Sequence, residues 1–497
     1  MEPDLFDVIV VGAGNAALSA ALSAKESGAD RVLVLEASPK RERGGNSTYT
    51  GGFFRFPYES MSDLEPMLND ESRGWVQRVD VEAYPRSAMM ADLKRQSKNR
   101  CDPELTQILV DNGYQAVRWL HEKGVRWQFP VGKVHDMKNL PEDARYTLAG
   151  GAALVTEEEG VGLIENLFEA VERAGIEVRY ESPVDSLLRE GSRVVGVRLR
   201  LSDGFEDVFG ASIVLGSGGF GANPEMRERY LGKGWDLVKI RGSRFATGHV
   251  LKQVLANGAQ AAGHWGGAHA SALAGNAPDV GRVDLTDKMS RYSYPYSISV
   301  NINAERFMDE GKDHLWMTYA STGSQIQQQP DARAYQIFDQ KVVHLLEPRY
   351  ELSEPVVANT IEELAVKLDL DPRVLTRTVD EFNQATSAVG NFNPLAKDGL
   401  ATEGLAIPKS NWAQPIDQGP FVAYEVTCGL TFTFGGIKID PSARVIDVEG
   451  NPIPGLWATG EITGGVFYHG YAAGSGLTFG TVFGRIAGAE AAGHAVR

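Results

Sequence analysis

The chain opens with an apolar, β-branched segment that predicts a buried parallel strand at residues 6–11. A glycine-rich turn follows at once, and the alanine-rich residues 16–28 predict a helix that ends at a glycine. Residues 31–35 (RVLVL) form a second apolar run, which is followed by Glu36. This order predicts a complete βαβ unit at the start of the chain.

Beyond this unit, the pattern divides the chain into three parts. Residues 60–125 have the spacing of amphipathic helices, and short apolar runs between 176 and 215 predict strands linked by turns. Glycine clusters become sparse in the middle and return near the C-terminus, where small residues predict a final helix. We therefore predict an α/β fold, in which a Rossmann-like nucleotide-binding domain (1–245 and 420–497) is interrupted by an α+β capping domain (246–419).

The first turn carries the motif with the clearest chemistry. Gly12-x-Gly14-x-x-Ala17 matches the dinucleotide-binding fingerprint G-x-G-x-x-G/A. The first glycine permits the tight turn, the second lets the backbone approach a pyrophosphate, and Ala17 lets the helix pack closely on the strand. Glu36 ends the second strand, where a carboxylate can accept hydrogen bonds from ribose hydroxyls. The alternative is a glycine-rich strand–helix turn in a protein that binds no nucleotide.

Composition narrows the classes of function. The 497 residues include 49 Lys and Arg against 65 Asp and Glu, a net charge of −16, so nothing supports general binding to nucleic acid. Two cysteines, Cys101 and Cys428, and nine scattered histidines give no disulfide scaffold and no metal motif. No run of about 18 apolar residues predicts a membrane span. The first residues lack the basic segment of a secretory signal, so we expect a cytoplasmic protein.

A series of segments in order along the chain carries a family resemblance. These segments are 8–17 (VIVVGAGNAA), 43–47 (RGGNS) with 51–52 (GG), 215–220 (LGSGGF), 300–301 (VN) with 306–310 (RFMDE), 433–436 (TFGG) and 458–461 (ATGE) with 464–465 (GG). The series resembles the succinate dehydrogenase/fumarate reductase flavoprotein family. It is most similar to the soluble tricarballylate dehydrogenase-like members, through residues 426–436 (VTCGLTFTFGG) and Phe467-Tyr468 ahead of Tyr471.

This resemblance implies an FAD cofactor, held by the two-part domain and covered by the capping domain. No histidine lies in the loop 44–52, so we expect FAD to be noncovalent. The residues implied for FAD are Gly12, Gly14, Asn15, Ala16, Ala17, Glu36, Ala37, Gly44, Gly45, Asn46, Ser47, Gly51, Gly52, Val184, Gly218, Gly219, Gly460, Glu461, Gly476 and Leu477. The last two begin the final helix, whose N–H groups would stabilise negative charge that develops on the flavin.

The resemblance also implies hydride transfer between FAD and a carbon β to a carbonyl or carboxylate, with a protein group handling the proton on the α carbon. The chain departs from the fumarate reductases at three positions. His314 stands where they have the proton-donating arginine, Thr431 replaces a histidine that binds the dicarboxylate, and Tyr471 aligns with their arginine clamp. These departures argue against fumarate or succinate as the substrate.

Tyr471 is similar in place to the tyrosines that distant relatives, the 3-ketosteroid dehydrogenases, use to polarise a ketone. We predict Tyr471 as the acid or hydrogen-bond donor, with His314 or Tyr319 as the base, because the ordinary histidine pKa of ~6.5 lies near operating pH. Packing in the core is the alternative for Tyr319. The candidate substrate-binding residues are His269, Thr431, His469, Tyr471 and Arg145, with structural or surface roles as alternatives for the histidines and the arginine.

Three hypotheses about function stay open. The first is an FAD-dependent oxidoreductase that desaturates or reduces a C–C bond beside a carboxylate, in the manner of tricarballylate dehydrogenase. The second is a desaturase of a neutral cyclic ketone, and the third is a flavin-binding protein whose partner does the chemistry, or an inactive flavoprotein. We expect a small-molecule substrate and an electron donor or acceptor that the sequence does not identify. The sequence shows no second dinucleotide-binding motif, so nothing in it supports direct use of NAD(P)H.

Overall fold

A computed structural model describes residues 5–130, 145–148, 150–386 and 390–495. Its first sheet has the order β18-β19-β11-β1-β2-β8. The central strand β1 (Leu5–Val11) pairs in parallel with β2 (Val32–Leu35) and with β11 (Gly204–Leu215). Helix α1 (Asn15–Glu26) connects β1 to β2, so the predicted βαβ unit is confirmed.

The other strands extend this sheet on both sides. Strand β11 continues a meander of β9 (Val184–Glu190) and β10 (Arg193–Leu201), while β8 (Glu177–Arg179) pairs with β2. On the opposite side, β19 (Pro452–Ala458) pairs in parallel with β11, and β18 (Arg444–Ile446) completes the edge. Strands from both ends of the sequence therefore build one sheet.

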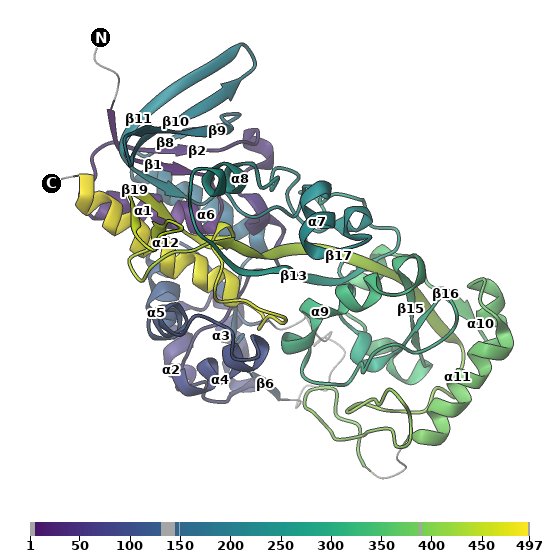
Figure 1. Cartoon of the computed structure of the whole chain (residues 1–497). Helices are drawn as coiled ribbons and strands as arrows, with labels where there is room; N and C mark the ends of the chain where they lie inside the picture. The colour runs from purple at the N-terminus through teal and green to yellow at the C-terminus, as the bar shows by residue number, and fades with distance from the viewer. Residues whose placement is uncertain (1–4, 131–144, 149, 387–389, 496–497) are drawn as a thin grey trace.

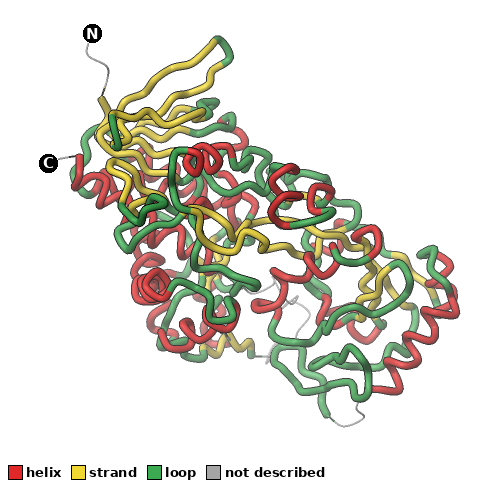
Figure 2. Tube along the Cα trace, viewed as in Figure 1, coloured by secondary structure: helices red, strands yellow, loops and turns green. Residues whose placement is uncertain are grey.

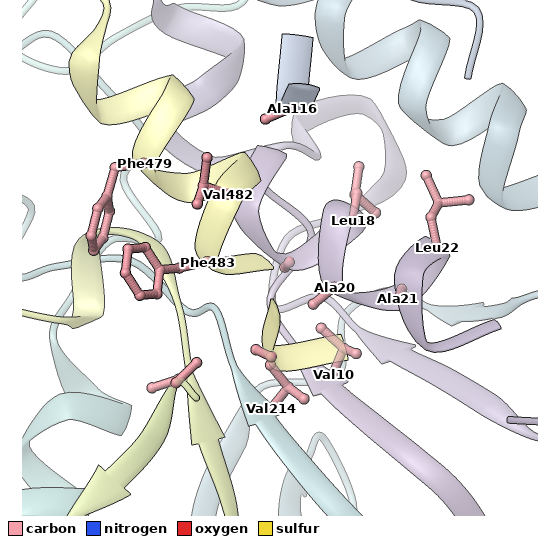
Figure 3. Close-up of a cluster of buried hydrophobic side chains, with 14 of the residues drawn as sticks. Val10, Leu18, Ala20, Ala21, Leu22, Ala116, Val214, Phe479, Val482 and Phe483 are labelled. Carbon is pink, nitrogen blue, oxygen red and sulfur yellow. The ribbon is translucent and has the colours of Figure 1, made fainter. Parts of the chain in front are cut away.

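Helices α1 and α12 (Ser475–Ala495) pack against each other beside this sheet (Figure 1). Figure 3 shows side chains from several elements meeting there, among them Val10 of β1, Val214 of β11, Leu18 of α1 and Phe483 of α12. All four are fully enclosed. Burial of apolar surface stabilises the fold by about 25 cal/mol per Å². The packing of the two helices on each other and on the sheet therefore holds both of their N-termini at the same end of the sheet.

The region after the first unit is mainly helical, as the spacing predicts (Figure 2). It holds α2 (Met61–Leu64), α3 (Asp70–Trp75), α4 (Arg86–Gln96) and α5 (Pro103–Glu122), followed by α6 (Glu159–Arg173). Two small sheets lie among these helices: β3 (Phe53–Phe54), β5 (Trp127–Gln128) and β7 (Leu154–Thr156) form one, and β4 (Val79–Val81) with β6 (Tyr146–Leu148) the other. Among the residues described, none of the helices is both long and apolar enough to cross a bilayer.

A second sheet dominates the middle of the chain. Its strands are β12 (Lys239–Ile240), β13 (Ala261–Ala274), β14 (Ile298–Asn301), β15 (Arg333–Phe338), β16 (Val356–Ala358) and β17 (Phe421–Ile437). The helices around it are α7 (Pro224–Leu231), α8 (His249–Ala256), α9 (Leu315–Gln327), α10 (Ile361–Lys367) and α11 (Pro372–Ala385).

The long strands β13 and β17 pair antiparallel and run between the two halves of the molecule (Figure 1). Because β17 starts at Phe421 yet belongs to the second sheet, the two halves are joined by continuous hydrogen-bonded backbone. The predicted domain boundaries at 245/246 and 419/420 stay a prediction.

Candidate active site

A cavity of about 360 Å³ lies at the carboxyl ends of β1, β2 and β11. In parallel sheets of this kind, ligands bind at that edge, where strand order reverses. The turn after β1 (11–16), the end of β2 (35–37) and the turn after β11 (216–218) form its floor. Further lining comes from residues 45–47, 182–184, 200, 243, 245–250 and 460–461.

Gly12 shows why the first turn needs a glycine. Its φ is +101°, which side-chain-bearing residues rarely adopt, and a Cβ at this position would lie 2.5 Å from the carbonyl oxygen of Gly216. The turns after β1 and β11 therefore touch through backbone alone. This close approach leaves room for an extended ligand across both turns.

Glu36 fits the role of a ribose-binding carboxylate. It is 5% exposed and lines the cavity, and its Oε1 accepts the backbone N–H of Ser38 at 2.8 Å. Burial raises the pKa of Glu36, despite hydrogen bonds that favour the charged form. A buried carboxylate with acceptor capacity to spare is stabilised by ligand hydroxyl donors.

Glu461 is held by the protein itself. Its Oε2 accepts from Asn46 Nδ2 at 2.8 Å and its Oε1 from the backbone N–H of Thr433 at 2.9 Å. Asn46 also donates to the Thr431 carbonyl oxygen and accepts the N–H of Ser243. This network ties the loop after β2 to β17 and to the segment after β19, so it shapes the cavity wall.

Most of the residues predicted for FAD line a cavity. On the first cavity lie Gly12, Gly14, Asn15, Ala16, Glu36, Ala37, Gly45, Asn46, Ser47, Val184, Gly218, Gly460 and Glu461. On a second, adjoining cavity lie Gly51, Gly476 and Leu477. The exceptions are Ala17, Gly44, Gly52 and Gly219, which line neither cavity because they pack against protein: Ala17 against Gly216, and the three glycines against Thr48, Thr156 and Thr433.

The second cavity has a volume of about 130 Å³ and continues the first. The two share the lining residues Asn15, Ala16, Asn46, Ser47, Gly460 and Glu461. Its walls are largely aromatic, formed by Phe53, Tyr292, Trp316, Tyr319, Phe432 and Tyr471. A ligand that fills the first cavity can thus end against a small, mostly apolar chamber.

Tyr471 lines this chamber from the segment just before α12. Its hydroxyl oxygen accepts the backbone N–H of Gly476 at 2.8 Å. Burial raises the pKa of Tyr471, partly offset by this hydrogen bond, so the phenol keeps its proton near neutral pH. The hydroxyl hydrogen is then available to a ligand oxygen.

His269, from β13, lies between two tyrosine rings. Its ring centroid is 4.9 Å from those of Tyr319 and Tyr471, each in an edge-to-face arrangement. Burial and the nearby charge of Arg241 lower the pKa of His269 to about 3, and burial raises that of Tyr319 well above its usual value. At neutral pH the chamber therefore holds a neutral histidine beside two protonated tyrosines.

A buried ionic cluster that the sequence motifs did not predict forms part of the chamber wall. Arg241 pairs with Asp287, which also accepts from Arg349 Nη1 at 2.9 Å. Arg241 Nε donates to Thr431 Oγ1 at 2.9 Å. Burial would raise the pKa of Asp287, but the two arginines outweigh it and lower the pKa to about 2. A signal existed: Arg241 directly follows the mostly apolar segment 237–240 (LVKI), and a cation buried beside such a segment needs a partner.

Three of the predicted residues lie elsewhere. His314 lines a separate cavity of about 50 Å³, and of the described residues only Tyr292 and Trp316 line both this cavity and the chamber. Arg145 pairs on the surface with Asp80, Nε to Oδ2 at 2.7 Å. His469 is exposed, and its backbone N–H donates to His264. The structure thus brings together Tyr471, Tyr319, His269 and Thr431, but not His314, His469 or Arg145.

Comparisons with known proteins agree with this geometry. A family model described as an FAD binding domain matches residues 7–479. A probable fumarate reductase of Shewanella frigidimarina is 27% identical, over 98% of this chain and 75% of its own length. A 4-oxocyclohexanecarboxylate 2-dehydrogenase of Sinomonas cyclohexanicum is also 27% identical, over 99% of this chain and 93% of its own length. The open conformation of a flavocytochrome c3 fumarate reductase superposes with a TM-score of 0.72 at 25% identity, covering 100% of this chain and 80% of that one.

Proposed function

The chain belongs to the FAD-binding family of fumarate reductase-type flavoproteins and is an FAD-dependent oxidoreductase, and from this premise we propose that it desaturates, or in reverse reduces, the C–C bond beside the ketone of a small cyclic substrate. The family predicted from the motif series is thus confirmed. The proposal favours the ketone hypothesis over a tricarballylate-like activity.

The first cavity is suited to hold the cofactor. In our proposal, the N-terminus of α1 and the turns at Gly12 and Gly218 hold the pyrophosphate, and Glu36 accepts the ribose hydroxyls. The flavin end then reaches the aromatic chamber past Asn46 and the start of α12, because the two cavities are continuous there. When bound, FAD accepts the hydride that leaves the β carbon, or supplies it in the reducing direction.

The observation that carries the proposal is the pairing of Tyr471 with Gly476 at the first turn of α12. The Tyr471 hydroxyl already has a donor, so its own proton can go to a ketone oxygen. Negative charge on that oxygen, which grows as the α proton leaves, is stabilised by the hydroxyl and by the positive end of the helix dipole. Such a donor makes the α proton more acidic.

The α proton needs an acceptor on the substrate's other side. His269 lies against both Tyr471 and Tyr319, and its Nδ1 accepts from no group among the described residues, so we assign it as the candidate acceptor. Its pKa of about 3 makes it a weak base, so the transfer depends on the acidity that Tyr471 confers on the α proton. Asp287 also lines the chamber, but its two oxygens already accept from Arg241 and Arg349. With bound FAD taking the β hydride, loss of the α proton to the protein would leave a C=C bond conjugated with the ketone.

The aromatic walls support a ring-shaped substrate. Six aromatic side chains line the chamber, and a flat or ring-shaped ligand packs well against such walls. Tricarballylate, with three carboxylates, would require more cations than the single Arg241 on the lining. The relative from Sinomonas cyclohexanicum is named for a six-membered cyclic ketone that bears a carboxylate.

Anaerobic flavin reduction tests the proposal without an external electron acceptor. The purified holoenzyme is mixed with 4-oxocyclohexanecarboxylate, cyclohexanone, tricarballylate or succinate, and the flavin absorbance is followed in a stopped-flow instrument. We expect bleaching with a cyclic ketone and an enone product by mass spectrometry. Bleaching by tricarballylate alone would reject the proposal in favour of the tricarballylate-like activity.

A further inference from the structure

Arg241 faces the chamber with part of its guanidinium unused. Nε donates to Thr431 Oγ1, and Nη1 donates to the Tyr49 carbonyl oxygen and to Asp287. Among the residues described, nothing accepts a hydrogen bond from Nη2. This nitrogen remains accessible, because it is absent from the fully buried side-chain atoms that lack a partner. Arg241 therefore presents a free donor to the chamber while three contacts hold its side chain in place.

Arg241 belongs to a buried network of charged side chains. Within the described chain, Asp287 is the carboxylate that pairs with Arg241, and Asp287 is shared with Arg349. Two other carboxylates, Glu347 and Glu159, act on Arg349. Burial raises the pKa of Glu347 to about 7, so near neutral pH it supplies only part of a negative charge. The carboxylate of Asp287 is thus divided between two guanidiniums, and Nη2 of Arg241 has no anionic partner among the described residues.

The same chamber also offers a neutral donor. The oxygen of the Tyr471 hydroxyl accepts the Gly476 N–H, so the O–H itself is left to donate to a ketone oxygen, and it does not suit a fixed charge. Tyr471 and Arg241 both line the chamber, together with aromatic side chains. A ligand that satisfied both groups would carry a ketone and an anion.

We propose that Arg241 binds a carboxylate of the substrate, so that the substrate class is a small cyclic oxo acid whose ketone lies at Tyr471. This inference rests on the proposed function, which it narrows from cyclic ketones to cyclic ketones that bear a carboxylate. The bidentate geometry of a guanidinium matches a carboxylate, which explains an arginine and not a lysine at this position.

Binding of a probe that cannot react tests Arg241 independently of catalysis. Cyclohexanecarboxylate has the ring and the charge but no ketone, and its methyl ester has the ring without the charge. Isothermal titration of the FAD-loaded enzyme at pH 7 should show the acid binding about 30-fold or more tightly than the ester, since a charge-assisted hydrogen bond is gained. Equal affinities in the unmodified enzyme would overturn the proposal, and this comparison needs no variant.

The variant Arg241→Gln should lose the preference for the acid while its affinity for the ester stays within about threefold. Arg241→Lys, which keeps the charge, should retain part of the preference. Arg244→Gln is the matched control, because Arg244 lies three residues away but pairs on the surface with Glu42. FAD content and melting temperature establish that each variant is folded. A parallel loss for acid and ester in Arg241→Gln would indicate a structural role and overturn the proposal.

Turnover separates this inference from the proposed function. With 4-oxocyclohexanecarboxylate, Arg241→Gln should raise the half-saturating concentration for flavin bleaching about 30-fold and change the limiting rate little. If the acid preference depends on Arg241 but no cyclic ketone bleaches the flavin, the carboxylate site stands and the proposed function fails. If ketones bleach the flavin at the same concentrations with and without a carboxylate, the carboxylate site fails and the proposed function stands.

Discussion

The hydroxyl of Tyr471 lies 2.8 Å from the backbone nitrogen of Gly476, five residues further along the chain. The tyrosine precedes α12 and the glycine lies in its first turn, so a side chain and a helix N-terminus meet at one point of the chamber. The N–H donates to the phenol oxygen, which leaves the phenol proton for a ligand.

Replacing Tyr471 with phenylalanine tests this donor. We expect Tyr471→Phe to slow anaerobic flavin bleaching by about 100-fold, which is typical when one donor to a developing oxyanion is removed, while FAD content stays unchanged. Tyr468→Phe is the control, because Tyr468 lines neither cavity and keeps the same ring. A bleaching rate in Tyr471→Phe equal to that of the control would remove Tyr471 from the mechanism.

Asp287 joins two buried arginines, so its charge supports the fold. We expect Asp287→Asn to lower the free energy of unfolding by about 3–5 kcal/mol, because both guanidiniums lose their shared partner. Urea denaturation at pH 7 measures this change. The exposed pair of Arg282 with Asp284 supplies the control, and Asp284→Asn should cost no more than about 1 kcal/mol.

A double-mutant cycle isolates the coupling within this cluster. Adding Arg349→Met to Asp287→Asn removes one of the stranded charges, so the double variant should be destabilised by less than the sum of the single changes. Strict additivity would mean that the two residues do not act on each other.

The pKa of Asp287 is lowered to about 2, so its stabilising charge is fully present above pH 3.8 and is lost as the pH falls toward 2.

His269 should make the protein less stable in acid. Its pKa is lowered to about 3, so between pH 6.5 and 3 the unfolded chain binds a proton that the folded chain does not. The contribution of neutral His269 to the free energy of unfolding is complete above pH 6.5. It falls as the pH decreases, by a few kcal/mol at most. Melting temperatures from pH 7.5 to 4 should decline less steeply for His269→Gln than for the unmodified protein.

The matched control for that comparison is His469→Gln, which changes an exposed histidine. It should leave the slope of melting temperature against pH nearly as it is. If His269→Gln and His469→Gln change the slope equally, burial of His269 is not the source of the acid sensitivity.

Gly12 and Gly28 separate backbone strain from steric contact. Both have positive φ, +101° and +97°, so alanine costs each about 1–2 kcal/mol of strain. A Cβ at Gly12 would also press on the Gly216 carbonyl oxygen, whereas nothing lies within 4 Å of one at Gly28. We expect Gly12→Ala to purify with little FAD and Gly28→Ala to keep its FAD, as measured by the ratio of absorbance at 450 nm to that at 280 nm. Equal FAD content in the two variants would contradict the tight turn as the basis of binding.

Local pattern determined the cofactor half of this protein. The strand 6–11, the glycine turn and the terminal Glu36 are contiguous, and their chemistry depends on backbone geometry that short sequences specify. Ala17, Gly44, Gly52 and Gly219 were also identified from the motifs, but they turned out to pack protein against protein. A glycine pattern indicates that the backbone approaches another group closely, but it does not show whether that group belongs to a ligand or to the protein.

Only the tertiary structure decided the chamber. Arg241, Asp287 and Arg349 are separated by 46 and 62 residues, and His269 and Tyr471 by about 200, so no local pattern links them. His314 was predicted from its distance along the chain to a motif, yet the start of α9 directs it to a neighbouring cavity. Side-chain chemistry depends on burial and on partners brought together by long strands such as β13 and β17. For this reason the sequence by itself determined that FAD binds, while the packing of distant segments decided which groups face the substrate.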